Sequence, residues 1–155
     1  MTTEQALLTE VSDVHLKALF NIELTNGWQC NVQDSFFKNF KLSHQQYNIL
    51  RILRGQKEHG VSVNDIKRRM IDKMSNVSRL IEKLHVKGFV ERQECPHDGR
   101  VVYVQLTAKG TALLTDIDAE LPRMRRIFDT LTVQEATELV RLLEKFRNTS
   151  EEDNI

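Results

Sequence analysis

The 155-residue chain is poor in the residues that brace small secreted domains or break helices. Its two cysteines, Cys30 and Cys95, stand 65 positions apart and are too few for a disulfide framework. Two prolines and six glycines leave long stretches uninterrupted, which favours a mainly helical chain. No apolar run reaches the roughly 18 residues of a membrane span. The acidic N-terminal segment lacks the basic-then-apolar pattern of a signal peptide, so we expect a cytoplasmic protein with no membrane partner.

Sequence patterns of common catalytic sites are also missing. The chain contains no glycine-rich phosphate loop, no H-E-x-x-H, no G-x-S-x-G and no pair of C-x-x-C knuckles. Its histidines are scattered and none makes a convincing catalytic pair: His15, His44, His59, His85 and His97. We therefore predict a protein that is not an enzyme and needs no cofactor.

The net charge of zero conceals an uneven distribution. Residues 1–35 and 111–155 each carry a net charge of −4, whereas residues 36–110 hold 15 lysines and arginines against 7 aspartates and glutamates, a net charge of +8. A basic centre between acidic ends is typical of a module that binds a polyanion, flanked by segments with another role.

The two ends of the chain show helical periodicity. One apolar face in the first segment consists of Leu7, Val11, Val14, Ala18 and Ile22. An amphipathic helix of this kind needs a partner, and the residues "NGW" at 26–28 are a candidate interruption. After Thr107 a second helical segment follows, which we expect Pro122 to kink or restart. A last helix opens with Thr132 and Glu135 as a capping box.

The basic centre has the element order of a winged helix-turn-helix. Ser43 and Gln46 cap one helix, and Ser62 caps a short second helix that carries basic residues at 67–69. Asp72 is expected to cap a third helix that ends at Gly88. The period then changes to two in "FVERQEC" and "RVVYVQL", which "PHDG" separates as a turn, so a β-hairpin is predicted. The expected fold is mainly α with a small β-hairpin wing.

The third helix has one apolar face and one polar, basic face, as a DNA-recognition helix requires. Over Lys73–Leu84 the predicted buried set is Met74, Val77, Leu80, Ile81 and Leu84, and the opposite face shows Lys73, Ser75, Asn76, Arg79 and Lys83. Asparagine suits adenine and arginine suits guanine in the major groove. Arg100, at the hairpin turn, can enter a narrow minor groove, and Asp98 is expected to hold the turn. The plainer alternative is a solvated amphipathic helix followed by an exposed arginine.

These residues also resemble a known family. The stretch "DGRVVYVQLT" has the spacing D-x-R-x-x-x-V-x-L-T and continues into "LTAKG", while "MSNVSRLIEKLHVKGFVER" and "LSHQQYNIL" precede it. Together they resemble the MarR family of bacterial transcriptional regulators. The resemblance implies a homodimer, most often a repressor, in which each winged domain reads one half of a pseudo-palindromic operator in double-stranded DNA. It also implies that Ser75, Asn76, Ser78 and Arg79 meet the major groove and that Asp98 and Arg100 form the wing motif.

The resemblance divides the chain into three parts. We expect an N-terminal helical dimerisation segment at 1–40, a winged helix-turn-helix domain at 41–106, and C-terminal dimerisation helices at 107–155. Members of the family often respond to small phenolic or aromatic ligands, for which a cleft lined by Trp28, Phe36, Phe37 and Tyr47 is the candidate site. Plain core packing is the more ordinary role of such aromatics.

Three further hypotheses compete with this interpretation. One is a winged-helix module that binds proteins and no DNA. Another is a thiol-based redox regulator. Cys30 has no positive neighbour in sequence, whereas Cys95 has His97 two positions away, which can favour its thiolate. The third is a metal site formed by Cys95, His97 and Asp98. Side chains along a strand point alternately to opposite faces and no fourth ligand is evident, so we predict no metal site.

Overall fold

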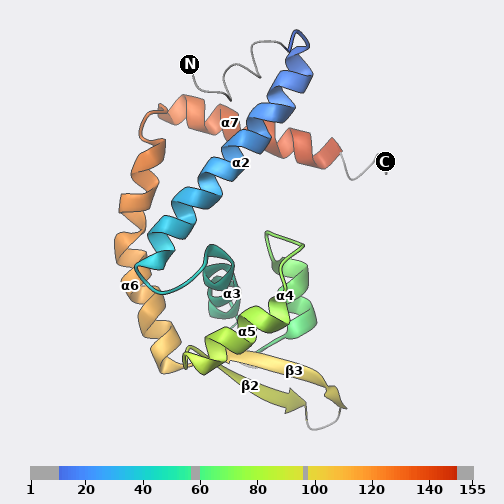
Figure 1. Ribbon diagram of the computed structural model, residues 1–155, viewed down its shortest axis with the longest axis vertical. Helices are drawn as coiled ribbons and strands as arrows, with labels where there is room; N and C mark the ends of the chain where they lie inside the picture. The colour runs from blue at the N-terminus through green and yellow to red at the C-terminus, as the bar shows by residue number, and fades with distance from the viewer. Residues whose placement is uncertain (1–10, 57–59, 96–97, 150–155) are drawn as a thin grey trace. The chain divides into compact units, whose positions relative to one another are not determined.

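A computed structural model describes residues 11–56, 60–95 and 98–149. Its elements, in chain order, are α2 (Val14–Lys38), α3 (His44–Arg54), β1 (Val61–Ser62), α4 (Val63–Arg69), α5 (Val77–Val86), β2 (Val90–Cys95), β3 (Asp98–Leu106), α6 (Ala108–Arg125), the 3₁₀ turn η1 (Arg126–Phe128) and α7 (Val133–Thr149) (Figure 1). The chain divides into two compact units, Met1–Ile117 and Asp118–Ile155. None of the helices in the described ranges is long and apolar enough to cross a membrane.

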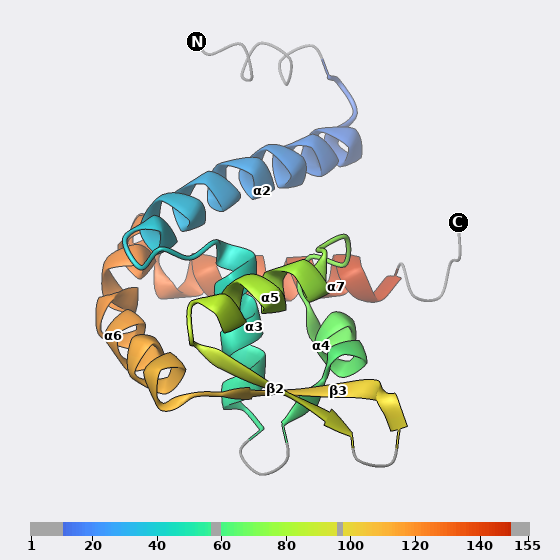
Figure 2. The same ribbon diagram turned by 60° about the horizontal axis from the view of Figure 1, so that its bottom comes forward.

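The predicted fold class is confirmed in the first unit. Helices α3, α4 and α5 gather beside a small antiparallel sheet with the strand order β1-β3-β2 (Figure 2). The hairpin pairs Val90 with Leu106 and Arg92 with Val104. The short strand β1 was not predicted, because two residues are too few to display an alternating pattern. It adds to the sheet through Val61 opposite Val104 and Ser62 opposite Tyr103.

A single apolar core holds these elements together. Each helix and strand of the winged domain contributes side chains that are almost fully buried, among them Ile49, Leu50, Ile66, Val77, Ile81, Leu84, Val90 and Val104. Leu114 and Ile117 extend the same core from the first half of α6. Burying a side chain of this size stabilises a fold by about 1.5–3 kcal/mol before entropy is counted. The core therefore fixes where α5 and the hairpin stand relative to each other.

The predicted helix caps are largely confirmed. The Ser43 hydroxyl accepts the amide of Gln46 at 3.2 Å, and the Gln46 side chain accepts the amide of Ser43 at 3.1 Å. The Ser62 hydroxyl likewise accepts the amide of Asp65 at 3.1 Å. Gly88 has a φ of +76°, a left-handed conformation that glycine adopts without steric cost, so α5 ends where the sequence indicates. Thr132 and Glu135 form the capping box expected before α7.

Neither of the two candidate interruptions ends a helix. Helix α2 runs from Val14 to Lys38 without a break at "NGW", since one exposed glycine weakens a helix by only about 1 kcal/mol. Helix α6 continues past Pro122 to Arg125, so the helix does not restart there. Proline removes one backbone donor, and α6 ends within a turn of it, so few further hydrogen bonds depend on that position.

Candidate nucleic-acid interface

The recognition helix begins later than the sequence predicts. Helix α5 starts at Val77, and its N-cap is Asn76, whose side-chain oxygen accepts the amide of Arg79 at 3.1 Å. The residue expected to cap the helix, Asp72, instead closes the preceding turn. One of its carboxylate oxygens accepts the amide of Met74 at 2.9 Å, and the other accepts the hydroxyl of Ser75 at 2.9 Å. These hydrogen bonds lower the pKa of Asp72, and the bond from the Met74 amide has the largest effect.

This shift of the helix start moves one residue from the predicted core to the surface. Met74 was expected to be buried, but it is 92% exposed, whereas Met70 is only 2% exposed and fills the core nearby. The helical spacing of buried residues begins at Val77. It does not apply to Met74, because Met74 lies in the turn before α5. Leu80, also predicted to be buried, is half-buried.

The exposed face of α5 carries three of the residues predicted to contact DNA, two of which, Ser78 and Arg79, were expected to meet the major groove. Ser78, Arg79 and Lys83 are exposed, and Asn76 stands exposed at the N-cap. Ser75 is half-buried, and its hydroxyl is engaged by Asp72. The structure thus gathers three predicted side chains on α5, while Asn76 and Ser75 belong to the approach to the helix.

A second group of positive charges lies on α4. Lys67, Arg68 and Arg69 are all exposed in its last turn. Arg68 forms an ion pair with Asp65, whose pKa is lowered by the Ser62 hydroxyl and then by Arg68. The amino group of Lys73 donates to the backbone oxygen of Arg68 at 2.6 Å and so lies beside this group. Exposed lysine and arginine side chains are suited to contacts with DNA phosphates.

The wing is tied to the recognition helix by an ion pair that the sequence did not reveal. Arg92 on β2 is paired with Glu82 on α5, and both side chains are partly exposed. An exposed pair of this kind contributes only about 0–1 kcal/mol to stability, but it links α5 directly to the hairpin. The backbone of Asp98 and Arg100 lies in β3, whereas the side chains of these two predicted wing residues lie outside the described part of the structure.

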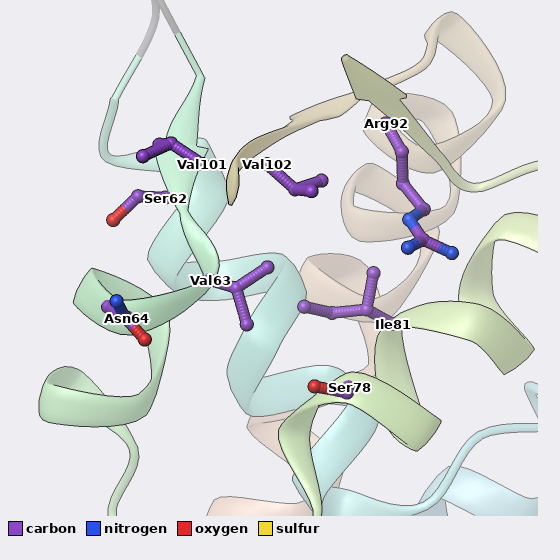
Figure 3. A pocket seen from close by; sticks show the side chains of 8 residues that line it. All are labelled: Ser62, Val63, Asn64, Ser78, Ile81, Arg92, Val101 and Val102. Carbon is purple, nitrogen blue, oxygen red and sulfur yellow. The ribbon is translucent and has the colours of Figure 1, made fainter. Parts of the chain in front are cut away.

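A hollow of about 240 Å³ lies between the recognition helix and the wing (Figure 3). Its lining residues come from β1 and the start of α4, from α5, and from the hairpin: Ser62, Val63, Asn64, Ser78, Ile81, Arg92, Val101 and Val102. The guanidinium of Arg92 and the hydroxyl of Ser78 are polar groups in a partly apolar lining (Figure 3).

The four aromatics predicted to line a ligand cleft do not line this hollow. Phe37 and Tyr47 are buried and stacked, with ring centroids 4.3 Å apart, and Phe36 packs edge-on against Phe37 at 5.0 Å. These three rings join α2 to α3 and have a packing role. Trp28 is 49% exposed on α2.

The described part of the structure adds no support for redox sensing by Cys30 or Cys95. Cys30 is half-buried with a free thiol. The side chain of Cys95, together with Pro96 and His97, lies outside the described residues. Within the described ranges, no three histidine, cysteine, aspartate or glutamate side chains are grouped as a metal ion would require.

Comparisons with known proteins agree with this architecture. The MarR family model matches residues 42–102. The HTH-type transcriptional regulator PapX of Escherichia coli is 24% identical over 106 residues, and the match spans 68% of this chain and 65% of PapX. The crystal structure of a mutant MarR from E. coli, complexed with operator DNA, has a TM-score of 0.74 at 23% identity, covering 86% of this chain and 94% of that one.

A second solved structure is closer in sequence. The MarR transcription factor from Planctomyces limnophilus is 31% identical, with a TM-score of 0.67 and coverage of 87% of this chain and 98% of that chain. Identity at this level across nearly a whole relative, on a shared winged fold, shows that the chain belongs to the MarR family.

Proposed function

We propose that the protein is a sequence-specific, DNA-binding transcriptional regulator that acts as a homodimer on a pseudo-palindromic operator and represses the genes beside it. The observation that carries the proposal is the surface of α5. One face of this helix is buried through Val77, Ile81 and Leu84, while the opposite face presents Ser78, Arg79 and Lys83 beside the basic residues of α4.

In this proposal α5 enters the major groove by its N-terminal half. The Arg79 guanidinium offers two parallel donors, which suit the O6 and N7 acceptors of guanine. Asn76 retains both amide donors and one oxygen lone pair after capping the helix, so it can still pair with adenine. The cations of α4 and Lys73 would bind phosphates and set the position of the helix, and Arg100 of the wing would reach the minor groove.

The exposed apolar residues outside the winged domain support the homodimer. On α2, Val14, Leu16, Leu19, Phe20 and Leu24 stand in solvent. On α7 the exposed apolar residues are Val133, Leu139, Val140, Leu142 and Phe146. Two helices with this much exposed apolar surface are unusual for a monomer and typical of an association surface. A second copy of the chain would cover them and place two recognition helices on one operator.

We also propose that a small aromatic or phenolic ligand releases the DNA. The hollow beside Arg92 supports this proposal, because its guanidinium has further N–H donors for an acidic ligand besides the one engaged by Glu82, and its valines suit a ring. A ligand there would press between α5 and the wing. Salicylate is a suitable probe: it should release bound operator from the wild type more readily than from Arg92→Ala, and equal release would contradict this site.

The DNA-binding proposal is tested by selecting an operator from random duplexes with the full-length protein and measuring its affinity by fluorescence anisotropy. Arg79→Ala should lose about 1–3 kcal/mol of discrimination at one base position in each half-site. Arg123→Ala, which removes an exposed arginine from α6, is the matched control and should bind as the wild type does. Selection that enriches no sequence would instead favour a winged-helix module for protein contacts, and equal weakening on all DNA would make Arg79 a phosphate contact.

A further inference from the structure

The turn between α4 and α5 exposes two large apolar side chains on an otherwise basic surface. Met74 is 92% exposed and Ile71 is 80% exposed. Single exposed apolar residues are common on protein surfaces and usually need no special reason. These two differ in their surroundings, because Lys73 lies between them and the cations of α4 precede them. Neither contributes to the core of the winged domain, whereas Met70, directly before Ile71, is buried in it.

The backbone that carries Met74 is held firmly. The Met74 amide donates to the carboxylate of Asp72 at 2.9 Å, and the Ser75 hydroxyl donates to the other oxygen of the same carboxylate. The Ile71 amide donates to the side-chain oxygen of Asn48 on α3 at 3.0 Å, so the turn is also anchored to the core helices. A turn fixed in this manner presents its side chains with little loss of backbone entropy on binding.

The position of Met74 adds a second observation. It stands two residues before the N-cap Asn76 and therefore just outside the end of α5 that carries Asn76 and Arg79. In helix-turn-helix proteins the N-terminal residues of the recognition helix contact base edges. An apolar side chain at this place would meet a groove whose edges are polar except for one group, the methyl of thymine.

We propose, on the basis of the DNA-binding function above, that Met74 is a specificity-determining residue that packs against the methyl group of a thymine in each half-site. The unbranched thioether can adjust its three torsions to reach the methyl group, and its polarisable sulfur increases the contact. Met74 is then exposed in the free protein because its side chain becomes buried only when DNA binds. Ile71, nearer to α4 and the phosphate-binding cations, is not assigned this role.

The test removes the thymine methyl and the methionine side chain separately and together. In the selected operator, each thymine is replaced in turn by deoxyuridine, which lacks only the methyl group, and affinities are measured by fluorescence anisotropy. For the full-length wild type, the replacement at one thymine in each half-site should weaken binding about fourfold, the value for one buried methyl group. For Met74→Ala the same replacement should have no effect, because the partner of the methyl group is gone.

Two variants serve as controls. Met74→Leu keeps an apolar side chain of similar size and should retain sensitivity to deoxyuridine. Val86→Ala removes another exposed apolar side chain, 77% exposed at the far end of α5, and should leave the sensitivity unchanged. Because Met74 is outside the core, its substitution should not alter the unfolding midpoint.

Three results would overturn the role of Met74: equal deoxyuridine effects in wild type and Met74→Ala, no effect at any thymine, or loss of sensitivity in Ile71→Ala instead. Each can occur while the protein still binds its operator tightly, so the proposed function would stand. Failure to select any operator would remove both.

Discussion

Replacing Gly110 with alanine should destabilise the winged domain, although the same change stabilises most helices. Gly110 lies in the first turn of α6 and is buried beside Phe89, the residue before β2. A Cβ atom built there would clash with the backbone oxygen of Phe89 and would stand 3.0 Å from its carbonyl carbon and 3.2 Å from Cδ2 of Leu106. Since the nearest neighbour is backbone, no side-chain rotation can relieve the clash.

The expected loss of stability can be estimated from the contacts that α6 would have to change. Restoring an ordinary contact requires the helix to move by roughly 1 Å from Phe89. That movement would strain the hydrogen bond from the Thr107 amide to the oxygen of Phe89, now 3.1 Å, which contributes about 1 kcal/mol. Overpacking of a core costs about 1–3 kcal/mol, and alanine returns up to about 1 kcal/mol of helix propensity. The net expectation is a loss of about 1–3 kcal/mol.

Thermal and urea unfolding at a fixed protein concentration measure this loss, which corresponds to a Tm lower by roughly 2–12 °C for a chain of this size. Gly27→Ala is the matched control. Gly27 lies inside α2 with no atom within 4 Å of a built Cβ, so alanine should stabilise the protein by about 0.5–1 kcal/mol. A Gly110→Ala protein as stable as the wild type would refute the close approach of α6 to Phe89.

Two further substitutions test the dimer and the turn before α5. Leu139→Asp places a charge on the exposed apolar surface of α7, so it should yield a monomer in sedimentation and lose tight operator binding. The control Gln134→Asp, on the same helix, should remain dimeric. A Leu139→Asp protein that is still a dimer would exclude this face of α7 from the interface. The lowered pKa of Asp72 means that its carboxylate contributes stability above its ordinary pKa and that this contribution is lost as pH falls through the lowered value. The difference in urea unfolding between wild type and Asp72→Ala should therefore shrink below about pH 4; a constant difference down to about pH 3 would contradict the role of the carboxylate.

Local signals predicted the winged domain well. Ser43 with Gln46, Ser62, and Gly88 act through contacts with residues a few positions away, so their roles can be read from neighbouring letters. The change from helical to alternating periodicity likewise predicted the hairpin, because each strand is long enough to show it.

The recognition helix shows why local signals are insufficient at its start. Asp72 and Asn76 are both good N-cap residues, and the sequence offers no means of choosing between them. The choice depends on contacts distant in sequence: Asn48 holds the amide of Ile71, and Met70 fills the core. Predicting the helix from Asp72 therefore buried Met74 incorrectly.

Part of the candidate site depends entirely on tertiary structure. Glu82 and Arg92 are ten positions apart on a helix and a strand, and nothing in their spacing indicates an ion pair. The roles of the aromatics also depend on tertiary structure, since the sequence left both a ligand cleft and plain core packing open for these rings. Phe37 and Tyr47 stack face to face and belong to the core.

If the basic surface of α4 and α5 binds DNA as proposed, the affinity must depend steeply on salt, and this dependence is the most direct test. A dimer that contacts roughly six to ten phosphates should lose roughly 10³–10⁵-fold in operator affinity between about 50 and 200 mM salt through counterion release. Affinity for a shuffled duplex should be weaker throughout and also decline with salt. Binding that is independent of salt and equal for operator and shuffled DNA would contradict the account.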